Sequence, residues 1–172
     1  MFYSGIDYRQ EPLLTAQKDR GVWSVSYKTI YWEDVVEGDS LPKVSLELTR
    51  DRIVMIVCGT RDIFPLHHDI DFARASGYEA PAAPIAFLQG LLGRCLTDWT
   101  GPTGKIRKIA LSLNSPNYQG DTIGVTGKVT KKYMDAGNHN IDCELVMTKQ
   151  DGTVSARAQA TVIIPSRTSG GL

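Results

Sequence analysis

The stretch that decides the fold spans residues 83–99 and reads APIAFLQGLLGRCLTDW. Pro84 suits the first turn of an α-helix, and apolar side chains are spread around the turns that follow. Gly101 and Pro102 then close the segment with a turn. Because a helix that is apolar nearly all round is a buried helix, this pattern predicts one long helix in the centre of a domain.

Stretches with the pattern of β-strands follow this helix, and turn residues separate them. They comprise residues 106–113, 122–131, 139–147 and 154–164. Alternation is clearest in the last stretch, where small and branched apolar residues occupy every second position from Val154 to Ile164. A face of small residues suits a sheet that packs closely on a helix. The sequence therefore predicts an α+β fold in which an antiparallel meander wraps around one long buried helix.

Shorter elements precede the long helix. Residues 49–58 begin with the capping candidates Thr49 and Arg50-Asp51 and carry apolar residues on one broad face, which favours a helix that ends at Gly59. Their β-branched run makes a strand a serious competitor. Residues 62–69 have the composition of a loop, and residues 71–76 suit one or two helical turns.

The first part of the chain shows no sustained period. Residues 23–31 suggest an extended segment, and residues 13–18 suit a short helix. We therefore expect an N-terminal extension, a folded domain and a C-terminal tail, with the bounds 1–30, 31–165 and 166–172.

Bulk properties exclude several classes of partner. The 172 residues suit one domain, and 19 basic residues balance 19 acidic ones, so nothing in the charge favours nucleic acid or a membrane surface. Cys58, Cys95 and Cys143 lack the close spacing of metal or redox sites. The chain also shows neither a secretory leader nor an apolar run of about 20 residues. We expect a soluble cytoplasmic protein.

The densest group of acid/base side chains lies in residues 61–69, which read RDIFPLHHD. Adding water to a double bond conjugated to a thioester requires a base for the water, an acid for the α-carbon and donors for the enolate oxygen. Asp62 and His67 can supply the first two functions from a single loop. Pro65 lies between them and fixes one backbone torsion, which limits the movement of the carboxylate relative to the imidazole.

The segment from Asp62 to His67 resembles the signature of the MaoC-like R-specific enoyl-CoA hydratases, usually written D-x-N-P-x-H, with the spacing from Asp to His intact. Asp69 and Ala73 fit the continuation H-x-D-x-x-x-A. Further matches in the expected order are Phe72, Gly77, Pro84-Ile85, Pro116 and Gly120-Asp121. The likeness spans residues 31–165 and implies a hot-dog fold, with the sheet wrapped around the central helix.

The same resemblance implies a function and an assembly. The substrate is an acyl-CoA or another acyl thioester, the 3-hydroxy product has the R configuration, and no cofactor or metal is needed. Pairing through the sheets implies a homodimer, or a heterodimer with a related hot-dog subunit. Residues 67–69 and 97–102 are also similar to runs in small MaoC-like subunits of actinobacterial steroid side-chain hydratases.

Departures from the family pattern point to the substrate pocket. Phe64 stands where the family has Asn, and Phe87-Leu88 replace the His-Gly that commonly opens the central helix. We therefore expect Phe64, Phe87, Leu88 and Gly90 to bind substrate, with the two rings favouring a bulky apolar acyl group. Backbone N–H groups at the start of the helix are candidate donors to the enolate oxygen.

Simpler interpretations compete with this one. Asp69 is more often the cap of a short helix than a catalyst, and His68 has no matching role in the family. A metal site at His67, His68 and Asp69 would lack a distant further ligand. A hot-dog thioesterase and a noncatalytic or half-active subunit of a heteromeric hydratase are the alternative functions, because fold alone does not decide chemistry.

Overall fold

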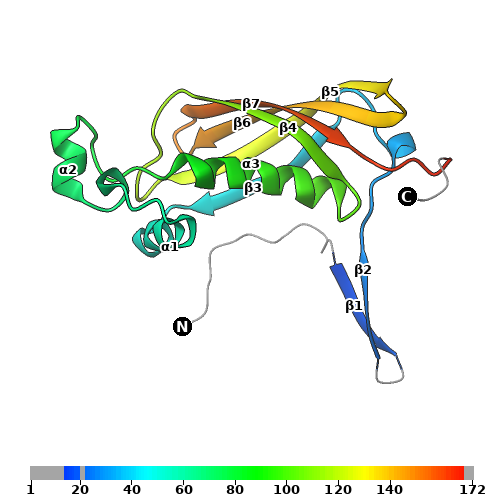
Figure 1. The fold of residues 1–172 in the computed structure, drawn as a ribbon, viewed down its shortest axis with the longest axis horizontal. Helices are drawn as coiled ribbons and strands as arrows, with labels where there is room; N and C mark the ends of the chain where they lie inside the picture. Colours follow the sequence, from blue (N-terminus) through cyan, green and yellow to red (C-terminus); the bar gives the residue numbers. More distant parts are fainter. Residues whose placement is uncertain (1–13, 20–21, 169–172) are drawn as a thin grey trace.

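A five-stranded antiparallel sheet with a long helix against one face forms the body of the molecule (Figure 1). This computed structural model describes residues 14–19 and 22–168. In spatial order the strands are β3 (Ser40–Glu47), β5 (Thr122–Asp135), β6 (Asn138–Lys149), β7 (Val154–Ile163) and β4 (Lys105–Leu113). The α+β hot-dog architecture expected from the sequence is confirmed.

The four predicted strands are all present, but the expected meander is only partly right. β5, β6 and β7 form consecutive antiparallel hairpins, whereas β4 pairs with β7 at the far edge of the sheet. The sequence analysis missed β3 altogether. Its pairing with β5 shifts register between Leu41 and Val44, so its buried residues do not alternate regularly and the period of a strand is hidden.

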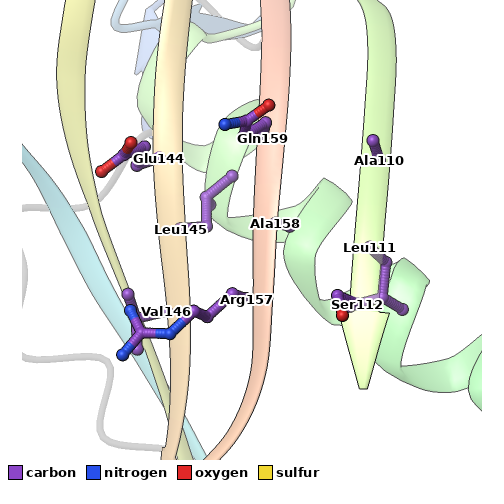
Figure 2. A pocket seen from close by; sticks show the side chains of 9 residues that line it. All are labelled: Ala110, Leu111, Ser112, Glu144, Leu145, Val146, Arg157, Ala158 and Gln159. Carbon is purple, nitrogen blue, oxygen red and sulfur yellow. The ribbon is translucent and has the colours of Figure 1, made fainter. Parts of the chain in front are cut away.

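The two faces of the main sheet differ in polarity and exposure. On β7 the side chains of Ala156, Ala158, Ala160 and Val162 are buried, as the alternation predicted. The opposite face carries exposed polar side chains such as Glu144, Arg157 and Gln159, and Figure 2 shows them on the side of the strands away from the helix. Within the described part of the chain, the sheet is therefore covered on one side only.

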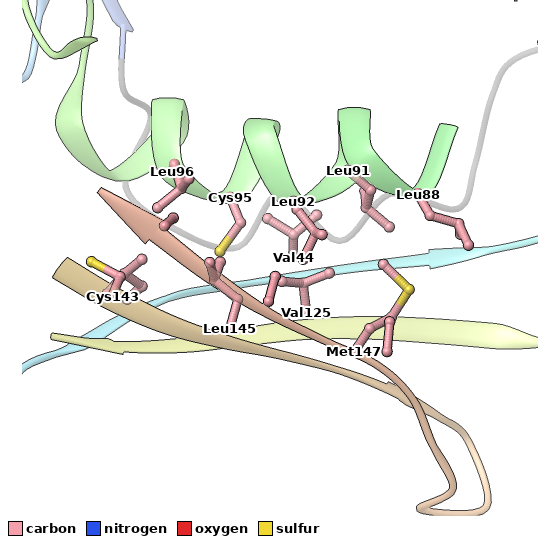
Figure 3. Close-up of a cluster of buried hydrophobic side chains, with 14 of the residues drawn as sticks. Val44, Leu88, Leu91, Leu92, Cys95, Leu96, Val125, Cys143, Leu145 and Met147 are labelled. Atoms are coloured by element: carbon pink, nitrogen blue, oxygen red, sulfur yellow. The ribbon is translucent and has the colours of Figure 1, made fainter. Parts of the chain in front are cut away.

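The long helix is α3 (Ile85–Thr100), and it packs on β3, β4 and β5. Figure 3 shows its apolar face directed at the sheet, where it meets Val125, Leu145 and Met147. The buried apolar positions of this face are Leu88, Leu91, Leu92, Cys95 and Leu96. The expectation of a helix buried all round is wrong, because the sheet covers one side and Ile85 and Gly90 on the other side remain exposed.

The competing interpretations of residues 49–58 are resolved in favour of a helix, α1 (Arg50–Thr60). Its cap is Thr49, whose side chain accepts a hydrogen bond from the Arg52 N–H. The helix runs past Gly59, which was expected to end it, and stops at Arg61 in the left-handed conformation.

Short helical turns complete the region before α3. They are η1 (Trp32–Asp34), η2 (Pro65–His67) and α2 (Ile70–Ala75). The Asp69 carboxylate caps α2 by accepting from the N–H groups of Asp71 and Phe72, as the cap interpretation predicted. The predicted loop at residues 62–69 therefore contains one 3-10 turn and leads into a capped helix.

A separate two-stranded sheet lies at the N-terminal side of the body. It consists of β1 (Leu14–Asp19) and β2 (Val22–Tyr27), and it projects away from the main sheet (Figure 1). The extended segment expected from residue 23 is confirmed as far as Tyr27. The short helix suggested for residues 13–18 is wrong for residues 14–18, because pairing with β2 supplies their backbone partners, and residue 13 lies outside the described residues. The proposed domain bounds remain a prediction.

All three cysteines are free thiols. Cys95 on α3 and Cys143 on β6 are buried in the core, and this burial raises the pKa of both thiols to about 12. Both side chains therefore stay protonated and pack as small apolar groups. Among the described residues, no helix is long and apolar enough to cross a membrane.

Candidate active site

Two turns of the chain place Asp62 and His67 together. Arg61 ends α1 with a φ of 57°, and this left-handed residue turns the backbone so that Asp62 begins a new segment. Pro65 then starts the 3-10 turn that carries His67. The Asp62 side chain is 40% exposed, whereas that of His67 is only 11% exposed. One partner of the pair thus faces solvent and the other is held in the protein.

The hydrogen bonding of His67 defines which nitrogen is available for chemistry. Nδ1 lies 2.7 Å from the backbone oxygen of Ala82. A carbonyl oxygen can only accept, so Nδ1 carries the hydrogen and, in the neutral ring, Nε2 keeps its lone pair. Nε2 lies 3.4 Å from Oδ2 of Asp62. Two acceptors face each other, so a shared proton fits between them, and a water molecule beside the pair can donate one O–H group to each.

The carbonyl that orients His67 is itself fixed on both sides. The Ala82 N–H donates to the Leu66 oxygen at 3.2 Å, and Ala82 also forms a β-bridge with Tyr118. The next residue, Ala83, donates its N–H to the Asn117 oxygen at 2.8 Å. A short segment before α3 is therefore tied both to the Asp62–His67 loop and to the chain that follows β4.

The pair opens into a cavity of about 420 Å³ at the start of α3. Its other lining residues are Leu66, Tyr78, Ala82, Ala83, Ile85, Leu88, Leu113, Asn114, Ser115, Pro116 and Asn117. The helix begins after Pro84, which makes no side-chain cap. The N–H groups of Ile85 and Ala86 lie in the first turn, where an α-helix offers no internal acceptor, so they can bind an anionic oxygen.

The structure brings only part of the predicted substrate-binding set to this cavity. Leu88 lines it, but Phe87 and Gly90 line a second cavity of about 410 Å³ on the other flank of α3. Phe87-Leu88 also do not open the helix, which begins at Ile85. The sequence pattern shows that these residues share one helix, and only the position of the sheet decides which flank each one faces. Substrate binding by Phe87 and Gly90 stays a prediction.

Phe64 lies beside Asp62 and His67 without lining the cavity. Its ring is 52% exposed and stands edge-on to the His67 ring, with a centroid separation of 6.2 Å. It also meets the Phe72 ring at 5.4 Å. Phe64 thus forms an apolar cover next to the imidazole, and its contact with substrate remains a prediction.

The neighbouring histidine has a local role. His68 is exposed, and its Nε2 lies 3.0 Å from the backbone oxygen of Ile63, which closes the loop on itself. Asp69 is occupied in capping α2. Among residues 28–168, whose side chains the structure describes, no group of three or more His, Cys, Asp or Glu is suited to a metal ion.

The sequence analysis missed the polar wall of the cavity. Ser115 and Asn117 follow the end of β4, more than forty positions after His67, and they reach the site because β4 ends at the cavity, which its last residue Leu113 also lines. Pro116 between them was noted because it matches the family pattern, and this was the one available signal.

A further hollow of about 390 Å³ lies on the polar face of the sheet in Figure 2, and no histidine lines it.

Comparison with known proteins relates this geometry to a family, although no family model matches the chain. The β subunit of 3-oxo-4,17-pregnadiene-20-carboxyl-CoA hydratase from Mycobacterium tuberculosis (strain ATCC 25618 / H37Rv) is 39% identical over 95 residues, which cover 55% of this chain and 74% of that protein. A chain in the crystal structure of the ChsH1–ChsH2 complex from Mycobacterium tuberculosis is 32% identical with a TM-score of 0.69, covering 75% of this chain and 98% of that one.

More distant structures share the fold. The R-hydratase PhaJ1 from Pseudomonas aeruginosa has a TM-score of 0.72 at 16% identity and covers 81% of this chain and 88% of its own. The MaoC-like dehydratase from Rhodospirillum rubrum has a TM-score of 0.71 at 23% identity, with coverage of 80% and 98%. The resemblance found in the sequence is thereby confirmed, and the chain belongs to the MaoC-like hot-dog hydratase and dehydratase family.

Proposed function

We propose that this chain is a hydratase/dehydratase that interconverts a trans-2-enoyl thioester and its 3-hydroxyacyl thioester, with CoA as the carrier. One observation carries the proposal: Nε2 of His67 and Oδ2 of Asp62 face each other across 3.4 Å beside the uncapped start of α3. Acid/base groups and oxyanion donors are the two things that hydration of a conjugated thioester requires.

The geometry supports a specific sequence of events. A water molecule on the cavity side of the pair donates one hydrogen bond to Nε2 of His67 and the other to the Asp62 carboxylate, and one of these two groups takes a proton from it. As its oxygen bonds to C3 of the enoyl group, the π electrons move towards the thioester oxygen, which binds the N–H groups of Ile85 and Ala86. The proton taken from water returns to C2, so atoms and charge balance and no cofactor takes part. Either Asp62 or His67 can return that proton.

The acyl group is proposed to be large and mainly apolar. Most of the cavity wall comes from aliphatic and aromatic side chains such as Leu66, Tyr78 and Leu88, which gain from burial against hydrocarbon at about 25 cal/mol per Å². The relative from Mycobacterium tuberculosis is named for a pregnadiene-carboxyl-CoA, a ring-bearing acyl group. A long or polycyclic enoyl-CoA is therefore the favoured substrate class.

Assembly with a second hot-dog subunit is part of the proposal. Among the described strands, β4 pairs on one side only, and its exposed residues include the apolar Ile106 and Leu113. An unpaired edge with apolar side chains favours addition of another strand. Leu113 also lines the cavity, so a subunit at this edge would help to close the site. A similar solved structure is itself a complex of two different chains.

A cytoplasmic location is also part of the proposal, because the three cysteines are free thiols.

The test is a hydration assay of the chain, alone and co-expressed with a candidate hot-dog partner, against short, long and polycyclic enoyl-CoA substrates. We expect hydration by a dimer or larger assembly in light scattering. A fully active monomer would contradict the assembly proposal. Release of free CoA without hydration would identify a thioesterase. Hydration by the assembly that survives Asp62→Asn would show that this chain is its noncatalytic subunit.

A further inference from the structure

The wall of the active-site cavity contains polar atoms that the fold does not use. Asn117 is only 1% exposed, yet neither its Oδ1 nor its Nδ2 has a hydrogen-bond partner among the described residues. The Oγ of Ser115 is likewise buried and unpartnered. Burying such groups without partners costs folding free energy, which an apolar residue of the same size would avoid. The presence of these polar side chains therefore indicates a role other than stabilising the fold.

Hydrogen bonds hold the backbone around Asn117, whereas its side chain makes none among the described residues. The Asn117 carbonyl accepts the Ala83 N–H at 2.8 Å, and the next residue, Tyr118, donates its N–H to Oδ2 of Asp121 at 2.8 Å. These bonds hold the segment against the start of α3. The amide of Asn117 is thus part of a fixed wall, on the same cavity as Asp62 and His67.

The chemistry of the two side chains limits what they can bind. The Asn117 amide offers both a donor and an acceptor, and the Ser115 hydroxyl also offers both. Neither carries charge, and among the described residues His67 is the only basic side chain that lines the cavity. A carboxylate or phosphate would find no permanent cation here, whereas a hydroxyl or a secondary amide matches both functions of the asparagine.

We propose that Asn117 and Ser115 form a polar subsite that binds an uncharged hydroxyl or secondary amide of the substrate. This inference rests on the proposed function, and it makes Asn117 a specificity-determining residue. The amide atoms are shielded from solvent, so binding requires the Asn117 side chain to turn towards the cavity. The polar group has two possible sources, a hydroxyl on the acyl group or an amide of the pantetheine arm.

The experiment uses Asn117→Leu, which keeps the size of the side chain and removes its hydrogen bonds. Two matched pairs of substrates separate the sources. The first pair is an enoyl-CoA with and without one hydroxyl on the acyl chain, and the second is an enoyl thioester of N-acetylcysteamine and of an alkyl thiol that lacks the amide. We expect kcat/KM to fall at least about tenfold for the polar member of one pair and less than about twofold for its matched compound.

A control separates binding from structure. Asn138 at the start of β6 is exposed and does not line the cavity, so Asn138→Leu should change kcat/KM less than about threefold on every compound. The melting temperature of Asn117→Leu should equal or exceed that of the wild type, because the unsatisfied amide is gone. Ser115→Ala should repeat the selectivity change in weaker form.

The result that overturns the proposal is an equal effect of Asn117→Leu on both members of both pairs, including no effect at all. The side chain would then hold an ordered water molecule or serve packing only. Failure of the proposed function looks different, because the wild-type protein would hydrate none of the compounds. In that case calorimetric titration with the same pairs still measures whether Asn117→Leu weakens binding of the polar member.

Discussion

The two cavities that flank α3 are nearly equal in volume, about 420 and 410 Å³, but they differ in how their polar groups are used. In the second cavity the guanidinium groups are already engaged: Arg52 donates to the Glu47 carbonyl at 2.6 Å and Arg94 to the Asp98 carboxylate at 3.2 Å. In the first, the uncapped start of α3 and the side chain of Asn117 have no such partner among the described residues. Unused polar groups, rather than volume, distinguish the proposed active site from the second cavity.

The difference between the two cavities arises from the elements that line each of them. The loop of Asp62 and His67 and the end of β4 close the first cavity, and both bring irregular backbone and polar side chains. Regular elements close the second, since α1 and β3 contribute Met55, Ile56 and Leu46 to it. Regular elements satisfy their own backbone groups, so little is left there to act on a substrate.

The largest effect on activity is expected from mutations of Asp62 and His67, on the first flank of α3. Asp62→Asn and His67→Ala should each lower the hydration rate at least about 100-fold, the scale of positioned acid/base catalysis, while the far-ultraviolet circular dichroism stays unchanged. Because the two groups act on one water molecule, the double mutant should be little worse than either single mutant. Arg94→Gln on the second flank is the matched control and should retain at least about half of the activity. Near-normal turnover of either site mutant would remove that residue from the mechanism.

An intermediate effect is expected for two leucines of α3, which are almost equally buried and can therefore be compared directly. Leu88 is 2% exposed and lines the first cavity, and Leu91 is 4% exposed and lines the second. Replacing either by Ala should lower the free energy of unfolding by about 2–5 kcal/mol, measured by urea denaturation. Only Leu88→Ala should change the ratio of kcat/KM between long and short enoyl-CoA substrates. A selectivity change that is as large in Leu91→Ala would place the acyl group on the wrong flank.

The smallest effect concerns the aromatic rings that the sequence suggested for the acyl channel. Phe64 touches His67, whereas Phe87 lies on the second flank. Phe64→Asn should therefore reduce the preference for bulky acyl groups by a few-fold, about 1 kcal/mol of lost apolar contact, and Phe87→Leu should change it less than about twofold. Steady-state kinetics on the panel measure both. A kcat/KM for crotonyl-CoA at or above that of long and polycyclic substrates would refute the preference itself.

Local patterns were sufficient for much of the fold. The caps Thr49 and Asp69, the apolar period of residues 83–99 and the alternation in β7 each predicted an element of the right type. The failures have different causes. The bulge in β3 is an irregularity that no local period shows, and the pairing of β4 with β7 depends on a partner distant in sequence. The hairpin of residues 14–18 with β2 is local, and there the sequence analysis chose the wrong element type.

The sequence by itself determined the family, the types of most elements and the short loop that carries Asp62 and His67, because periodicity, capping and close spacing are properties of neighbouring residues. Tertiary structure alone decided how that loop can act. The Ala82 carbonyl that directs His67, the flank of α3 that receives Leu88 and the burial of Asn117 all arise from contacts between separate elements. Hydrogen-bond partners and burial depend on packing in three dimensions, which a one-dimensional pattern does not contain.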